Sequence, residues 1–273
     1  MTTLTAPQSN SILESIRRFL ESIAVTDKWA LLEPAVAKME RDFKLIWSHQ
    51  KTLFLREMVR YQGQFTESLS EDQIDRIMNK VSIITATEME TAIRTGRMSA
   101  MTTAAEHFIS VNKFDISFSL ANPKAVEYLA QSGATRVVID RTTQGYIRTI
   151  VTEGAEKGWS YNKTASEISK RFDGFSVKLP QKHLRNRAEL VVVNETGNAY
   201  EVATSSVVDD MERKGLLMEK SWMTSGDDRV SPGCAENEAQ GWILNAEAFP
   251  SGHMHPLRFP GCRCTTLYRR RPN

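Results

Sequence analysis

Apolar residues recur at three- and four-residue spacing through the first two-thirds of the chain, which predicts long amphipathic helices. The first helix is expected to begin near Ser9 or Ser11, since either hydroxyl can cap a helix. Its apolar positions are Ile12, Ile16, Leu20 and Ile23. Two further helices are expected at about residues 28–61 and 72–111, with Gly96 as a candidate interruption of the second. Such helices are typical of a bundle or a coiled-coil arm.

The pattern changes at residues 113–123, where Asn122 and Pro123 mark a turn and a new helix start. We place a domain boundary here, between a helical arm at residues 1–112 and a second domain at residues 113–273. Shorter helices are expected at about residues 123–132, 137–157, 163–172 and 180–214. The second, third and fourth of these are each followed by a glycine, a residue that favours helix ends.

Helical periodicity is lost after Gly215, and the chain becomes rich in glycine and proline. Three short segments, at residues 216–224, 241–244 and 265–270, have the character of strands. The sequence therefore predicts an α+β fold that is predominantly α. Long N-terminal helices and a helical middle would be followed by a small C-terminal antiparallel sheet with a loop-rich candidate zinc site.

Composition and charge reduce the number of function classes that the chain could belong to. The 273 residues can form one large domain or two modest ones, and the hydrophobic fraction of 41% is that of an ordinary globular protein. The net charge of +2 makes no strong case for nucleic acid. No apolar run approaches the roughly 20 residues that span a bilayer, and the N-terminus does not resemble a signal peptide. We therefore expect no membrane association and a cytoplasmic compartment.

All three cysteines, Cys234, Cys262 and Cys264, lie in the last forty residues. An odd count in a reducing compartment argues against a disulfide framework. Both thiolates of a C-x-C pair can reach one ion, and Cys234 would approach from another loop. Adding His253 or His255 would complete three sulfurs and one nitrogen, a set that suits structural zinc. The alternative is that the cysteines are buried small hydrophobic residues and the histidines lie on loop surfaces.

Four sequence elements resemble one known family. D-D-R-V-S-P-G-C at residues 227–234 is similar to the D-x-R-V-x-x-x-H element of Mu F-like phage head morphogenesis proteins. F-P-G-C-R-C at residues 259–264 resembles their terminal H-P-x-C-R-C signature. The stretches at residues 187–200 and 156–172 are similar to the family's R-A-x-x-I-A-R-T-E helix and G-x-S-x-x-E-I-A segment. The resemblance covers about residues 114–264, and four elements in the right order are far more specific than one.

Two departures from the family pattern bear on the candidate zinc site. Cys234 stands where many members have histidine, which preserves a metal ligand. Phe259 stands where the signature has histidine, which removes one. His253 or His255 would have to replace it from a few residues upstream. Without either, only the three cysteines remain as ligands, one fewer than a closed structural zinc site has.

Other polar and aromatic residues around these motifs are expected to be structural. Asp228 and Arg229 could be read as catalytic, but we expect them, with Asp227, to pin the turn before Cys234. We expect Glu195 to be a polar anchor between its helix and the sheet rather than a catalytic carboxylate. Trp222, together with Trp242, should pack in the core of the small sheet.

The basic tail formed by Arg269, Arg270 and Arg271 is a candidate DNA contact beside Tyr268. Its alternative interpretation is a solvated chain end.

The resemblance implies a virion structural protein rather than an enzyme. Such a protein would bind the portal protein and other capsid or scaffold proteins during head assembly in the host cytoplasm. It would then lie inside the capsid or at the portal vertex, with a role in DNA packaging or ejection and contact with phage DNA. The helical arm would make the portal contact.

Two alternative functions remain. One is a metal-dependent hydrolase or a transferase-like enzyme. The sequence lacks H-E-x-x-H, G-x-S-x-G and a phosphate-binding glycine loop, and only a short basic tail follows Cys264, so we expect no fused effector domain. The other alternative is a DNA-binding zinc module, which the near-neutral net charge disfavours.

Overall fold

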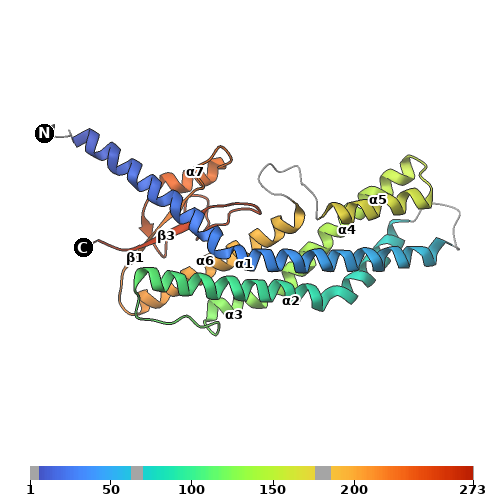
Figure 1. The fold of residues 1–273 in the computed structure, drawn as a ribbon, viewed down its shortest axis with the longest axis horizontal. Coiled ribbons are helices and arrows are strands. Elements are labelled where there is room, and N and C mark those ends of the chain that lie inside the picture. Colours follow the sequence, from blue (N-terminus) through green and yellow to red (C-terminus); the bar gives the residue numbers. More distant parts are fainter. Residues whose placement is uncertain (1–5, 63–69, 176–185, 273) are drawn as a thin grey trace. The chain divides into compact units, whose positions relative to one another are not determined.

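The structure is a computed structural model that describes residues 6–62, 70–175 and 186–272 (Figure 1). Side chains are described at residues 28–60, 70–175 and 186–272. The side chains of the expected caps Ser9 and Ser11 therefore lie outside the described side chains. The expected helix start near residue 180 lies outside the described residues.

Helices make up most of the described chain, and the strands follow Gly215. The helices are α1 (Ala6–Gln62), α2 (Glu71–Asn112), α3 (Pro123–Ala130), α4 (Ser132–Glu156), α5 (Tyr161–Gly174), α6 (Arg187–Arg213) and α7 (Pro232–Ala239). The strands are β1 (Met218–Met223), β2 (Ile243–Leu244) and β3 (Thr265–Arg270). They form an antiparallel sheet in the order β2-β1-β3. The predicted α+β fold, predominantly α with a small C-terminal sheet, is confirmed.

Two elements differ from the sequence prediction. Helix α1 is continuous from Ala6, whereas the periodicity had suggested one helix before residue 28 and another after it. Helix α7 lies in a segment predicted as loop. Among the helices that the structure describes, none has a long enough apolar stretch to cross a lipid bilayer.

Side-chain caps explain where several helices begin. Before α2, the Ser70 hydroxyl accepts the Gln73 backbone N–H, and the Gln73 side chain accepts the Ser70 N–H, which is a reciprocal capping box. Ser160 caps α5 in the same position. Ser231 caps α7, and Pro232 follows at the first helical position, where a missing N–H costs nothing.

The described chain divides into two compact units, each built from separate stretches of sequence. Unit 1 comprises Met1–Pro34, Ala100–Ala125 and Thr196–Asn273, and unit 2 comprises Ala35–Ser99 and Val126–Glu195. The sheet and all three cysteines belong to unit 1. These compact units do not test whether residues 1–112 and 113–273 are functionally distinct domains, so that boundary stays a prediction.

The core of unit 2 is formed by helices on both sides of that expected boundary. Phe54 of α1 packs near Phe172 of α5, with ring centroids 6.3 Å apart. Gly96 does not interrupt α2. Its missing side chain instead allows close packing of α1 and α2, because a Cβ there would lie 2.5 Å from the sulfur of Met39.

Unit 1 places the small sheet beside polar groups of α6. The fully buried carboxylate of Glu201 accepts hydrogen bonds from the Thr265 hydroxyl and from the backbone N–H and hydroxyl of Thr266, at the start of β3. It also forms a buried ion pair with Lys28 of α1 at 2.6 Å. These bonds satisfy the charged groups that the interior would otherwise exclude.

Candidate metal centre

Two short segments of unit 1 carry the three cysteines. Cys234 lies in the first turn of α7, whose start is set by Ser231, and its backbone N–H bonds to the Ser231 hydroxyl. Cys262 and Cys264 lie on the loop that leads into β3. Trp222, on β1, packs edge-on against Phe249 at 5.1 Å between ring centroids, within the same buried cluster.

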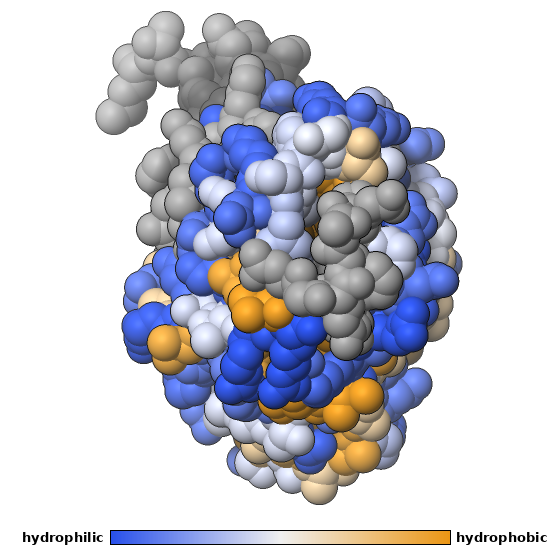
Figure 2. All heavy atoms as spheres, turned by 90° about the vertical axis from the view of Figure 1, so that its right-hand side faces the viewer, coloured by the Kyte–Doolittle hydropathy of each residue, from blue (hydrophilic) through white to orange (hydrophobic). Residues whose placement is uncertain are grey.

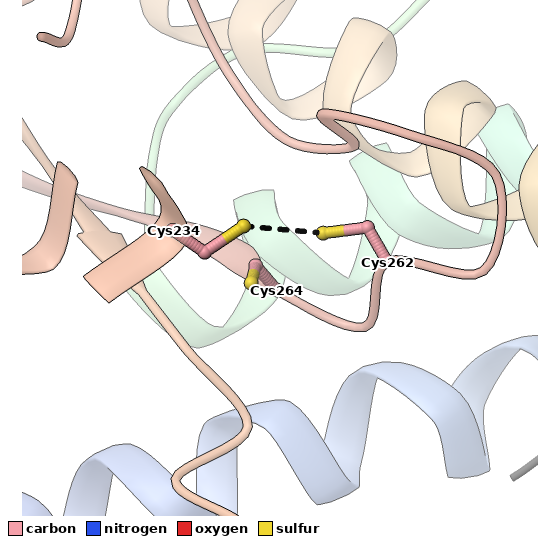
Figure 3. A group of neighbouring side chains, drawn as sticks. All are labelled: Cys234, Cys262 and Cys264. Atoms are coloured by element: carbon pink, nitrogen blue, oxygen red, sulfur yellow. Dashed lines mark hydrogen bonds between the residues drawn. The ribbon is translucent and has the colours of Figure 1, made fainter. Parts of the chain in front are cut away.

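The three sulfur atoms lie within 4.8 Å of one another, and the Cys234 and Cys262 sulfurs are 4.0 Å apart (Figure 3). The three residues are only 1%, 3% and 4% exposed. Around one tetrahedral zinc ion with bonds of about 2.3 Å, two sulfurs would lie roughly 3.8 Å apart. The spacing of the thiols therefore fits one soft metal ion bound by all three sulfurs.

The neighbouring thiols of Cys262 and Cys264 favour a single negative charge between them when no ion is bound. The pKa of Cys262 is lowered to about 6, chiefly because the Cys264 thiol donates a hydrogen bond to it. The same hydrogen bond, together with burial, raises the pKa of Cys264 far above its usual range. Cys262 and Cys264 thus share one proton between their two sulfurs, and a bound cation would be needed to hold both as thiolates.

An otherwise unpaired donor lies beside the sulfurs. The indole N–H of Trp222 is buried and has no oxygen or nitrogen partner among the described residues. It lies near Cys264 and favours the negatively charged form of that thiol. A donor in this place suits a thiolate that ligates a metal, since hydrogen bonds around the ligands tune such sites.

Neither histidine joins the cysteines, contrary to the expected fourth ligand. Nδ1 of His253 lies 3.0 Å from the carbonyl oxygen of Ser251, and Nδ1 of His255 lies 2.6 Å from that of Pro256. Within the described residues, the compact group of ligand atoms consists of the three sulfurs alone. Phe259 is 38% exposed, so it does not fill the missing ligand's place as a core residue.

An ion pair ties the turn before α7 to the loop that carries Cys262 and Cys264. Arg263, between Cys262 and Cys264, donates to both carboxylate oxygens of Asp227 at 2.7 and 2.6 Å. The pKa of Asp227 is lowered, chiefly by these hydrogen bonds. Asp227 also accepts the backbone N–H of Arg229, which shapes the turn.

The comparison with protein families bears on the same part of the chain. The model of the family described as phage Mu protein F like protein matches residues 146–267. This region is therefore similar to proteins of the phage Mu F-like family. The similarity points to a phage head-related protein. No curated protein and no solved structure matches the chain. The Mu F-like region contains α5, α6 and the whole cysteine cluster.

Two residues singled out in the Mu F-like region have smaller roles than expected. Asp228 is 92% exposed in its side chain, and its closest approach to Arg229 is 3.8 Å. Asp227, rather than this pair, pins the turn before Cys234. In the sequence, this role of Asp227 was indicated by Arg263 inside C-R-C, which offers an ion-pair partner to either Asp227 or Asp228.

Glu195 anchors a helix to a helix rather than to the sheet. Its carboxylate accepts two hydrogen bonds from Arg97 of α2, at 2.9 and 2.6 Å, within unit 2. The position that binds the sheet is Glu201, six residues later on α6, which sequence reasoning missed. Both are buried glutamates in one helix, and only the helix orientation distinguishes them.

The basic tail lies just beyond the Mu F-like region. Arg269 is held by Glu219 on the neighbouring strand and stacks over Trp242, with 4.2 Å from its guanidinium carbon to the ring centroid. Arg271 approaches the same carboxylate at 3.8 Å. Trp242 therefore packs under an arginine at the sheet edge, whereas Trp222 is the buried tryptophan of the core.

Proposed function

We propose that this protein is a minor head protein that acts in phage head assembly, bound to the portal and to neighbouring capsid or scaffold proteins. The match of residues 146–267 to the phage Mu F-like family carries this proposal. A role in DNA packaging or ejection belongs to the same proposal. The protein would act as a structural component of the virion rather than as an enzyme.

Exposed apolar side chains on the N-terminal helices support a protein contact there. Leu45 on α1 is 70% exposed and Ile83 on α2 is 76% exposed. An open groove of about 620 Å³ lies beside Leu45 and is lined by both helices. Figure 2 shows hydrophobic side chains reaching the surface in separate patches among hydrophilic ones. Exposed apolar groups next to a groove are typical of surfaces that bind another protein.

A zinc ion held by Cys234, Cys262 and Cys264 would have a structural role. The sheet of unit 1 is small, and its loops are long, so ligation would join α7 to the loop before β3. The sulfurs are buried against Trp222, Ile243 and Phe249, which leaves a substrate little access to the ion. Zinc here would stabilise the fold and would supply no reaction chemistry.

Procapsid incorporation tests the assembly role. Leu45→Asp in the full chain should reduce the number of copies that co-purify with portal-containing procapsids, because a buried carboxylate opposes association. Leu217→Asp is the matched control, since Leu217 is 64% exposed but lies outside the N-terminal helices. Equal incorporation of both variants and the parent would contradict a portal contact through this surface.

Elemental analysis tests the metal. Protein purified without chelator should contain about one zinc per chain, and Cys262→Ser should release it and expose the C-terminal loops to protease. His253→Ala and His255→Ala should retain the zinc, because neither imidazole lies with the sulfurs. A metal-free parent whose Cys262→Ser variant resists protease equally well would show that the thiols only pack.

A further inference from the structure

A buried group of side chains connects the cysteine cluster to α1, more than 200 residues away in sequence. The ammonium of Lys28 donates to Glu201 at 2.6 Å and to the backbone carbonyl of Cys264 at 3.1 Å. Both side chains of this ion pair are completely buried. The ammonium also lies 4.9 Å from the ring centroid of Tyr200.

The next residue of α1 contacts the same loop. The indole N–H of Trp29 lies 3.5 Å from the backbone carbonyl of Arg263. Two successive carbonyls of the C-R-C segment therefore face donors from α1. The Trp29 ring in turn packs against Gly197 of α6, where an added Cβ would lie 2.9 Å from the ring edge.

Glu201 holds the chain immediately after the cluster. Its carboxylate binds Thr265 and Thr266, the two residues that follow Cys264. Lys28 and Glu201 together thus fix the backbone from residue 264 to residue 266. A metal site binds more tightly when its ligands are already held in place, because ordering them otherwise reduces the affinity.

We propose that Lys28 and Trp29 position the Cys262–Cys264 segment for metal binding, so that an ion at the cysteine cluster and the packing of this part of α1 stabilise each other. This inference rests on the proposed zinc site and extends it to residues outside the Mu F-like region. Loss of the α1 contacts should weaken zinc binding. Conversely, zinc should slow the local opening of α1 around Lys28.

The affinity for zinc is measured by competition with a chromogenic chelator, in the full chain with reduced thiols. Lys28→Met combined with Glu201→Gln removes both charges of the pair and leaves no unpaired ion in the interior. Gly197→Ala crowds both the Trp29 ring and the Leu257 side chain without changing any charge. Loss of a group that orients metal ligands typically costs 10–100-fold in affinity, so we expect each variant to bind zinc about tenfold or more weakly.

Lys38→Met is the matched control. It makes the same substitution on the same helix, but it removes only the exposed ion pair with Asp42. Its zinc affinity should equal that of the parent. Circular dichroism checks that each variant is folded. Folded Gly197→Ala and double variants with the parent's affinity would overturn the inference while leaving the zinc site intact.

Hydrogen exchange in the unaltered protein provides a test that requires no variant. Adding zinc should slow amide exchange at residues 28–32 of α1, and exchange there that is indifferent to bound zinc would overturn the inference. A parent chain that binds no zinc at all would refute both the zinc site and this coupling. The two failures are therefore distinguishable.

Discussion

The guanidinium of Arg263 donates to both carboxylate oxygens of Asp227, and this contact joins the loop that supplies Cys262 and Cys264 to the turn before α7, which supplies Cys234. Arg263 is the middle residue of C-R-C, and Asp227 begins the turn that leads to α7. The pair therefore relates the two halves of the candidate metal site through side chains that touch no sulfur. Its partly exposed position suggests a modest energy and a definite geometric role.

Asp227→Asn should make the free energy of unfolding depend less on pH in the acidic range. The lowered pKa of Asp227 means that folding favours its charged form. The contribution is complete above the ordinary pKa of 3.8 and is lost as the pH falls through the lower folded value. Because the pair is partly exposed, we expect less than about 1 kcal/mol. Urea unfolding between pH 2 and 7 measures it, with the exposed Asp228→Asn as control. A pH-independent difference between the parent and Asp227→Asn would contradict this explanation.

Arg97→Met should strongly destabilise unit 2. The substitution leaves the buried carboxylate of Glu195 without its cation, and breaking such a pair costs about 3–5 kcal/mol. Lys163→Met removes an exposed partner of Glu167 and should leave the denaturant midpoint close to that of the parent. Denaturant midpoints of both variants give the comparison. Similar losses in the two would mean that burial of the Arg97–Glu195 pair has no energetic weight.

Gly96→Ala and Gly145→Ala should act in opposite directions. Both glycines lie inside helices, where alanine is favoured by roughly 1 kcal/mol. A Cβ at Gly145 meets nothing within 4 Å, so this variant should be more stable than the parent. At Gly96 the Cβ would collide with buried Met39, and overpacking costs about 1–3 kcal/mol. The thermal unfolding midpoints of the two variants and the parent test this expectation. Stabilisation by Gly96→Ala would show that Met39 can move aside.

Arg270→Ala should weaken DNA binding more than Arg269→Ala, if the basic tail contacts phosphate. Arg270 is exposed and forms no ion pair among the described residues, whereas Glu219 already neutralises Arg269. Losing one phosphate contact should reduce the slope of log affinity against log salt by about 1. Binding to a nonspecific duplex over a range of salt concentrations measures this slope. An unchanged slope in Arg270→Ala would remove the tail from any DNA contact.

Local sequence signals were sufficient for most of the secondary structure. The 3.6-residue period of apolar positions and the glycines after α4 and α6 act over a few residues. The loss of that period after Gly215 located the sheet. Helix α7 was missed because it has only eight residues and almost no apolar face, although Ser231 and Pro232 announce its start.

The sequence alone also indicated the resemblance that the family match at residues 146–267 supports, and it singled out the three cysteines, because motif order and residue chemistry can be read without coordinates. The tertiary structure decided which groups meet. It excluded the two histidines from the sulfur cluster, assigned the sheet to Glu201 rather than Glu195, and brought Lys28 to the carbonyl of Cys264. Those outcomes depend on loop paths and on the rotation of α6, which arise from contacts between residues far apart in the chain. Periodicity and propensity depend only on residues that are close in sequence, so they do not predict contacts between residues that are far apart in the chain.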